Sequence, residues 1–270
     1  MCRFAIKRRV RPIRLVLLVG MCLVAGQTLT VVCQTPIAKP SPASQDALPV
    51  YIEEFFLSEA VRSEEHGELQ LTLDGMVSRG QGSAADGKSA GIDIEYGMTK
   101  RLQFTMETPY GIQSTASSEL PVSWSTQTVG LLYQFIRSNH PFALCGSLGA
   151  NLPLTSRGET SFEPELLAAK GFGKLQIHFS VIPELGGNDR SLDYNIAAVR
   201  PFVHQLIPTL EFNGRRNSGI NSFYVTPGIY KHLPHRLEVG IGVPIGASSH
   251  SNPAGAILKM TWEIGGDDDD

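Results

Sequence analysis

The sequence predicts a closed antiparallel β-barrel of about twelve strands, of the type that crosses bacterial outer membranes. Three observations support this fold class. The chain opens with an export leader, and from residue 67 onward apolar and polar side chains alternate along segment after segment. The connections between these segments are short and long in turn, which fits a barrel whose two ends face different compartments.

The leader consists of six cations followed by an apolar run over residues 15–25. This is the layout of a secretory signal peptide, because a helix that crosses a bilayer needs about 20 apolar residues. We assign residues 1–33 to a Sec-type signal peptide, with cleavage after Gly26 or after Cys33. A lipoprotein is disfavoured, since Val32 precedes Cys33 where a small residue is expected.

Cysteine use and charge agree with export. Three of the four cysteines fall in or beside the leader, so Cys145 has no partner for an intramolecular disulfide. Removing the six leader cations from 23 basic residues leaves 17 against 26 acidic residues, a net charge of about −9. A mature chain this acidic is not expected to bind nucleic acid.

Residues 34–66 precede the alternating segments. Residues 35–49 are rich in Pro, Ser and Ala without periodicity, which predicts a flexible linker. Residues 51–65 mix acids with apolar side chains and fit either a short helix or an extended lead-in. The stretch 50–66 is also a candidate to enter the barrel and block its pore. We assign the barrel to residues 67–264 and an acidic tail to residues 265–270.

The clearest strands are short segments with one apolar and one polar face, at residues 69–73, 92–96, 102–106, 175–179, 237–241 and 258–262. Weaker candidates begin near Ser123, Phe142, Phe162, Leu192, Leu206 and Ser222. The total of about twelve is even, as expected for a single-chain bacterial barrel. Pro208 and Pro227 fall inside proposed strands, where proline removes a ladder donor, so we expect bulges there.

The connections separate the two ends of the barrel. Tight connections are predicted at residues 99–100, 138–139, 172–173, 203–204 and 233–234. Longer polar stretches span residues 78–87, 111–122, 153–160, 186–191, 214–219 and 246–253. Because outer-membrane barrels have short periplasmic turns and longer outer loops, both ends of the chain are expected on the periplasmic side.

Aromatic residues fall near both ends of the strands, as in the interfacial girdles of membrane proteins. The band at the periplasmic end comprises Tyr96, Tyr133, Phe135, Phe142, Tyr230 and Trp262. The band at the outer end comprises Tyr110, Trp124, Phe162, Phe212 and Phe223. Packing in a core is the alternative for any one of them.

Two stretches carry a family resemblance. Residues 96–104 read YGMTKRLQF and lead to Thr-Pro-Tyr at 108–110, and residues 235–244 read HRLEVGIGVP. The chain resembles, over residues 67–264, an outer-membrane barrel family named for the meta-cleavage pathway of phenol degradation. The resemblance implies a transporter or channel for small molecules, with hydrophobic or aromatic solutes suggested by the family name. The end of the chain departs from it, because Trp262 and Ile264 are followed by Gly and Asp instead of ending on an aromatic residue.

Alternation turns a set of charged side chains toward the lumen, because ionisable groups beside lipid are costly. The predicted lumen-lining residues are Asp74, Asp93, Glu95, Arg101, Glu107, Glu165, His178, Asp193, Glu211, Glu238, Lys259 and Glu263. Acids predominate, so an open pore is expected to favour cations. The alternative is a lumen closed by side chains and salt bridges.

A hydrolase is a further alternative. His178 and Ser180 lie two residues apart, hence on one strand face, and Asn195 on the next strand is placed to orient the imidazole. The pairing resembles that of outer-membrane phospholipase A. Here it faces the lumen and not the lipid, so we expect no enzyme and no cofactor. We also expect no metal site at His232 and His235, because Pro234 places them in a turn.

We therefore predict a passive outer-membrane channel or transporter for small solutes. Its expected partners are outer-membrane lipids, lipopolysaccharide and the barrel assembly machinery. The alternative from another class is a structural or adhesion barrel with a closed lumen.

Overall fold

The computed structural model describes residues 48–80, 86–115, 118–119, 126–137, 141–154, 159–186, 190–202 and 205–266. The predictions for the signal peptide, its three cysteines, most of the linker and the last four aspartates lie outside these residues. Among the described residues, no helix is long and apolar enough to cross a membrane.

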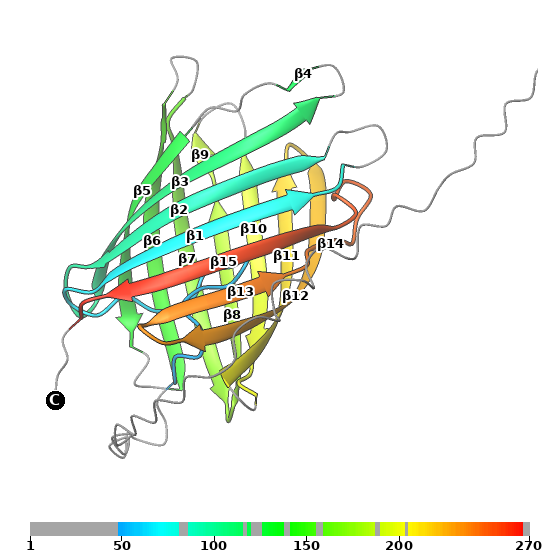
Figure 1. The fold of residues 1–270 in the computed structure, drawn as a ribbon. Helices are drawn as coiled ribbons and strands as arrows, with labels where there is room; N and C mark the ends of the chain where they lie inside the picture. The colour runs from blue at the N-terminus through cyan, green and yellow to red at the C-terminus, as the bar shows by residue number, and fades with distance from the viewer. Residues whose placement is uncertain are drawn as a thin grey trace, which may run out of the picture. The chain divides into compact units, whose positions relative to one another are not determined.

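The described residues form a closed antiparallel barrel, as the sequence predicts (Figure 1). Within them, twelve strands make up the wall: β1 (Leu69–Ser78), β2 (Gly87–Gly97), β3 (Leu102–Thr115), β5 (Thr126–Ile136), β6 (Phe142–Pro153), β7 (Ser161–Phe172), β8 (Leu175–Pro183), β10 (Ser191–Val199), β11 (Leu206–Asn217), β12 (Ile220–Leu233), β13 (Leu237–Gly242) and β15 (Gly255–Ile264). Each pairs with the next along the chain, and β1 pairs with β15 to close the ring.

Three two-residue strands lie at the end of the wall opposite to where β1 begins, which the sequence predicts to be the outer end. They are β4 (Ser118–Glu119), β9 (Leu185–Gly186) and β14 (Ile245–Gly246). β9 pairs with β7 beyond the end of β8, and β14 pairs with β12 beyond the end of β13. They therefore continue β8 and β13 after a short interruption.

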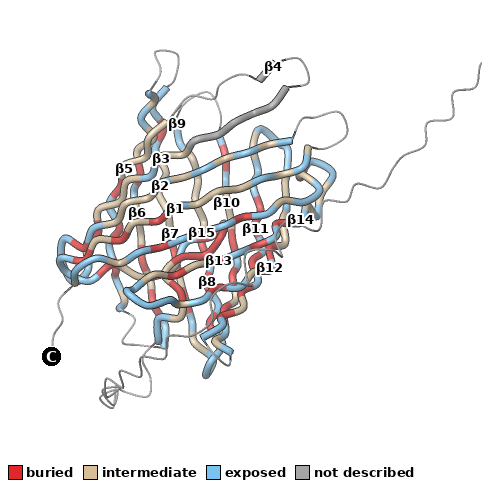
Figure 2. Tube along the Cα trace, in the orientation of Figure 1, coloured by how far each residue is buried: buried red, intermediate tan, exposed pale blue. Residues whose placement is uncertain are grey.

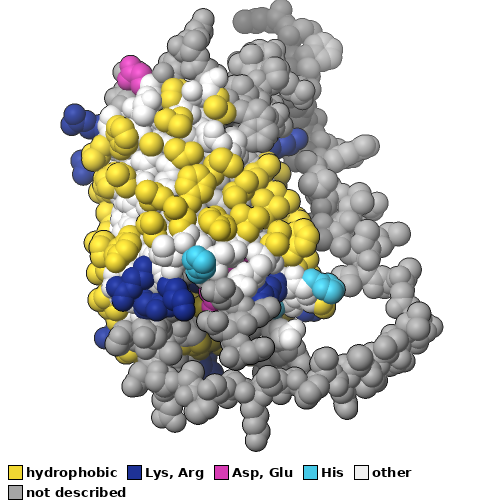
Figure 3. Space-filling view, turned by 90° about the vertical axis from the view of Figure 1, so that its left-hand side faces the viewer, with side chains coloured by type: hydrophobic (Ala, Val, Ile, Leu, Met, Phe, Trp, Pro, Cys, Tyr) yellow, Lys and Arg dark blue, Asp and Glu magenta, His cyan; other side chains and the backbone are white. Residues whose placement is uncertain are grey.

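The two faces of each strand have opposite polarity, and the apolar face is the outer one. On β8, Leu175, Ile177 and Phe179 are exposed, whereas Gln176, His178 and Ser180 are buried inside. Figure 3 shows the result as a broad band of hydrophobic side chains on the outer surface. This inversion relative to a water-soluble barrel is what a lipid-facing barrel requires.

One predicted girdle residue is placed differently. Tyr133, Phe135, Phe142 and Trp262 are exposed at one end, and Phe162, Phe212 and Phe223 at the other. Tyr230 instead is only 1% exposed, because alternation on β12 turns its neighbour Ile229 outward and Tyr230 inward. Trp124 and the side chain of Tyr110 lie outside the described part.

The polar stretch 214–219 is not a loop, which corrects the predicted alternation of short and long connections. β11 continues to Asn217 and β12 starts at Ile220, with Asn217 opposite Ile220. Ser218 and Gly219 both have positive φ, at 48° and 86°, as a tight two-residue hairpin turn requires. Polar composition misleads here, because the outer ends of these strands are themselves polar.

The two mid-strand prolines do not produce the predicted bulges, since the β11–β12 register is regular through both. The Pro208 carbonyl accepts from Arg200 N just beyond the last β10–β11 pair, so its nitrogen also faces the end of that ladder. The Pro227 carbonyl accepts from Val243 N, at the interruption between β13 and β14. Each proline therefore sits where the neighbouring ladder ends or is interrupted, which is where a missing N–H donor is tolerated.

Most of residues 48–66 lies inside the barrel, and we call this stretch the plug segment. It appears in Figure 1 as the blue trace within the lower part of the barrel. Ile52, Phe55 and Phe56 join a buried cluster with side chains of β10, β11, β12 and β15, and Leu48 and Val61 join one with β5, β6 and β7. Buried residues therefore concentrate at this end of the barrel, as Figure 2 shows.

Candidate functional site: a plugged acidic cavity

The plug segment has no regular secondary structure, so its backbone needs other partners. Side chains of the wall supply them. Glu211 on β11 accepts hydrogen bonds from Phe56 N at 2.8 Å and Leu57 N at 2.9 Å. Glu238 on β13 accepts from Glu53 N at 3.2 Å, and the Gln103 amide oxygen on β3 accepts from Glu64 N at 2.7 Å.

A buried ion pair joins the plug to β15. The Lys259 Nζ atom lies 2.7 Å from Glu54 Oε2, and both side chains are about nine-tenths buried. Gln70 Nε2 donates to Glu54 at 3.1 Å and to Glu95 at 3.1 Å, so the amide links plug and wall. Charge-assisted contacts of this kind are strong when both partners are desolvated and bonded.

A second charged centre lies where the plug joins β1. Arg62 Nη2 lies 2.8 Å from a Glu53 oxygen, 3.1 Å from Glu64, 3.4 Å from Glu263 and 3.9 Å from Glu68. Burial raises the pKa of Glu64 to about 7 although Arg62 opposes this, and the nearby Glu68 raises it further. Burial likewise raises the pKa of Glu53 well above its usual range. One guanidinium thus faces four carboxyl groups, so the acids in this centre outnumber the positive charge.

Aromatic packing also holds the plug, and we call the ring contacts of Phe55 and Phe56 with the wall the seat of the plug. The Phe56 ring stacks on Tyr230, with centroids 4.4 Å apart. Gly228 on β12 and Gly242 on β13 face each other in the ladder and leave room for this ring. A Cβ added at Gly228 would lie 2.1 Å from a Phe56 ring carbon. Phe55 contacts the His178 ring edge-on, with centroids 4.8 Å apart.

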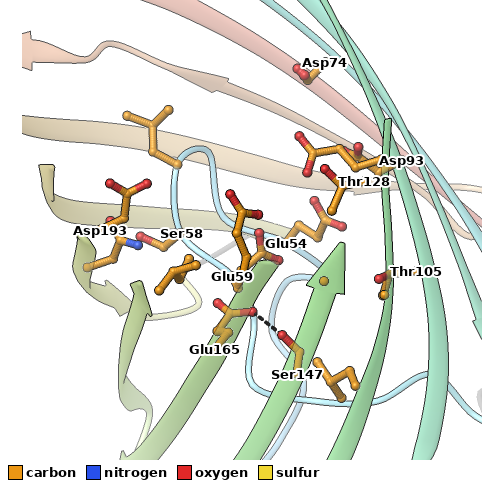
Figure 4. Close-up of a pocket in the computed structure, with 18 of the residues that line it drawn as sticks. Glu54, Ser58, Glu59, Asp74, Asp93, Thr105, Thr128, Ser147, Glu165 and Asp193 are labelled. Atoms are coloured by element: carbon orange, nitrogen blue, oxygen red, sulfur yellow. Dashed lines mark hydrogen bonds between the residues drawn. The ribbon is translucent and has the colours of Figure 1, made fainter. Parts of the chain in front are cut away.

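Above the plug lies a cavity of about 520 Å³ inside the barrel. Figure 4 shows Glu54, Ser58 and Glu59 projecting from the plug toward it. The predicted residues on its wall are Asp74, Asp93, Glu95, Glu107, Glu165, Asp193 and Lys259. The structure thus brings seven of the predicted side chains together around one space.

Other predicted residues are placed elsewhere. Glu211, Glu238 and Glu263 bind the plug, and His178 is buried against Phe55. Arg101 does not face the lumen, because it lies in the exposed turn before β3 and the alternation of the strand does not extend into that turn.

Sequence reasoning missed the contribution of the plug to the cavity. The side chain of Glu59 is open to the cavity but lies deep within the barrel, and this depth, with the carboxylates of Glu165 and Glu54, raises its pKa well above the usual range. Leu132 and Ile182, which share the inward face of their strands with polar residues, add apolar patches to the wall. Alternation offers a signal for the polar strand residues of the wall, but no periodicity points to Glu59.

The His178–Ser180 pair is not arranged as a nucleophile and its base. His178 Nε2 lies 3.3 Å from Gln176 Oε1, and the Ser180 hydroxyl accepts from Asn195 Nδ2 at 3.0 Å. Both side chains are buried. His232 Nε2 lies 2.9 Å from the Tyr51 carbonyl oxygen, so this histidine also contacts the plug.

The fold and the cavity define a transmembrane-type β-barrel with an internal plug. No known protein family and no curated protein matches the chain. Solved structures do match, and three of them are porins or outer-membrane channels. The KdgM porin has a TM-score of 0.56 at 8% identity, covering 73% of this chain and 99% of its own.

Two further structures are similar. An outer-membrane channel from Pseudomonas putida F1 has a TM-score of 0.56 at 11% identity, covering 84% of this chain and 100% of its own. The NanC porin has a TM-score of 0.52 at 8% identity, covering 71% and 97%. At these identities the likeness establishes the barrel fold.

Proposed function

We propose that this protein is an outer-membrane channel or transporter that passes small solutes by diffusion, with the plug segment as its gate. The observation that carries the proposal is the polar cavity of about 520 Å³ inside a closed barrel, bounded on one side by the plug. The outer-membrane channels among the structural neighbours support the location and the class.

The plug is suited to gating because it is held by side-chain contacts and not by a strand ladder. Its main anchors are the Glu54–Lys259 pair, the two backbone bonds to Glu211 and the Arg62 centre. Such contacts can be broken without opening the barrel wall.

The cavity wall suggests the solute class. Carboxylates exceed cations around it, so cations and neutral solutes are favoured over anions. By resemblance to the meta-pathway family, we extend the proposal to hydrophobic or aromatic solutes. The apolar patches at Leu132 and Ile182 provide contact for such molecules.

The second candidate is a structural or adhesion barrel with a closed lumen. The observation that favours it is the plug itself, which fills the periplasmic part of the barrel with buried side chains.

Planar-bilayer conductance on the mature chain separates the two. We expect discrete current steps from the parent protein, and longer or larger openings from Glu211→Ala, which loses two bonds to the plug backbone. Glu159→Ala, an exposed residue at the outer end, should behave like the parent. Current from neither the parent nor Glu211→Ala, with folding verified by heat-modifiable gel migration, supports the closed barrel.

A further inference from the structure

The outer surface carries basic side chains at the end of the barrel where β1 begins and β15 ends. We call six of them the cationic collar: Arg101, Arg137, Lys170, Lys174, Arg200 and Lys231. They come from turns or strand ends between β2 and β12, and all six are exposed. Figure 3 shows Lys and Arg side chains gathered along the lower edge of the hydrophobic band.

The collar has no counter-charge within the described residues. None of its six side chains lies within ion-pair distance of a described carboxylate. Among the described acids that are exposed, only Glu65 lies at this end. Asp86 and Glu159 belong to the outer end, and Glu59 and Glu107 belong to the cavity. At the outer end, by contrast, Arg215 lies 3.4 Å from Asp193 and 3.8 Å from Glu184. Among the described residues, the collar is therefore a surface of positive charge that no carboxylate pairs.

Two of its lysines show where the collar lies along the barrel axis, namely at the edge of the apolar outer surface. Lys170 faces outward between Phe142 and Ile177 in the ladder, and these two flanking side chains are exposed and apolar. Its Nζ atom lies 5.3 Å from the centroid of the Phe172 ring. Lys231 occupies the same kind of position between Leu206 and Val239. Such side chains lay their stems against apolar surface and carry the charge to the lipid headgroups.

We propose that the cationic collar binds the anionic phosphate headgroups of phospholipids in the leaflet that faces the periplasm. This inference rests on the outer-membrane location and orientation in the proposed function. Basic side chains at a membrane surface attract anionic lipid within about a Debye length. Lipopolysaccharide occupies the opposite leaflet, so phospholipid is the anionic lipid within reach of this end. The collar would hold the barrel at a defined depth and concentrate anionic lipid around its periplasmic end.

Lipid retention measured by native mass spectrometry tests the proposal. The mature chain is refolded into vesicles of phosphatidylcholine and phosphatidylglycerol in equal parts, then released in mild detergent. We expect the parent to retain phosphatidylglycerol over phosphatidylcholine by about fivefold, and to lose this preference in high salt. A variant combining Arg137→Gln, Lys170→Gln and Lys174→Gln should retain both lipids equally.

The matched control combines Arg79→Gln, Lys88→Gln and Arg190→Gln, three exposed cations at the outer end, and should keep the preference of the parent. Equal retention of the two lipids by the parent would overturn the proposal, as would a preference that survives in the collar variant. Conductance is measured on the same samples, so a parent that conducts but shows no lipid preference overturns the collar proposal and leaves the channel proposal standing. Failure of the parent to insert into vesicles removes the location on which both proposals rest.

Discussion

Lys259 is a buried cation whose partner, Glu54, belongs to the plug. Replacing Lys259 with Met leaves the Glu54 carboxylate buried without its counter-charge. Breaking a buried pair in this way costs about 3–5 kcal/mol, and here the cost falls on the plugged state. We expect hydrogen exchange of the amides over residues 52–58 to become at least ~10-fold faster in Lys259→Met.

The matched control removes both charges. Glu54→Gln combined with Lys259→Met should recover most of the protection, because no uncompensated charge remains. Exchange in Lys259→Met as slow as in the parent would show that the pair does not hold the plug.

The Arg62 centre predicts a pH dependence of the gate. When the plug is released from the barrel, Glu64 has an ordinary pKa near 4.5, whereas in the plugged state burial raises its pKa to about 7. The plugged state therefore binds the proton more tightly, so the plug is held best at low pH and loses stability as pH rises toward about 7. Glu53 acts in the same direction. We expect the open probability in planar bilayers to rise between pH 5 and pH 8.

Glu64→Gln should reduce this rise, because the side chain no longer titrates. Glu65→Gln, an exposed neighbour, should leave it unchanged. The prediction is wrong if Glu64→Gln and the parent respond equally to pH.

At the level of single residues, alternation is enough to place most acids on the lumen side, because only one face of a lipid-exposed strand tolerates charge. Alternation cannot place Arg101, because this residue lies in a turn. It also cannot place Tyr230, because an aromatic side chain is compatible both with a lipid-facing position and with the buried stack that it forms on Phe56. Glu59 and Glu54 could not be placed, because their positions depend on tertiary contacts of a segment without periodicity.

Among the elements, β12 and β13 carry the glycines that make room for the plug. Gly228 and Gly242 face each other and admit the Phe56 ring, which stacks on Tyr230. Gly228→Ala places a methyl group where Phe56 sits, so we expect it to displace the plug. The measurable result is faster proteolytic cleavage within residues 48–66 and an increase in conductance.

Two variants make this test specific. Gly75→Ala adds the same methyl group on β1, where the nearest atom, the Ser89 carbonyl oxygen, is 4.0 Å away, and should have no effect. Phe56→Ala in the Gly228→Ala background should restore part of the plug contacts by removing the clash. Equal cleavage in Gly228→Ala and Gly75→Ala would contradict the proposed seat.

The strands themselves are well predicted from sequence, because period-two alternation reports directly on a two-faced strand. Connections are less predictable. The 214–219 stretch has loop-like composition, yet it comprises the last residues of β11 and a tight turn. The plug segment was compatible with a helix or an extended lead-in, and only its partners on the wall determine that it folds into the lumen.

On the scale of the whole molecule, the barrel combines an apolar outer wall with a polar interior. The outer wall must be apolar to lie in lipid, so polar and charged side chains collect inside, where they both bind the plug and line the cavity. Closing the ring removes exposed strand edges, so the wall does not depend on the plug for its hydrogen bonds. A gate can therefore move within a wall that stays intact.

The most direct test of a gated, acidic channel is the reversal potential of the Glu211→Ala variant in a planar bilayer with a KCl gradient. We expect single-channel currents whose reversal potential shows preference for K⁺ over Cl⁻, and a weaker preference when Asp93 and Glu107 on the cavity wall are also replaced by Asn and Gln. A folded variant that carries no current, or one that prefers Cl⁻, would contradict the proposed channel.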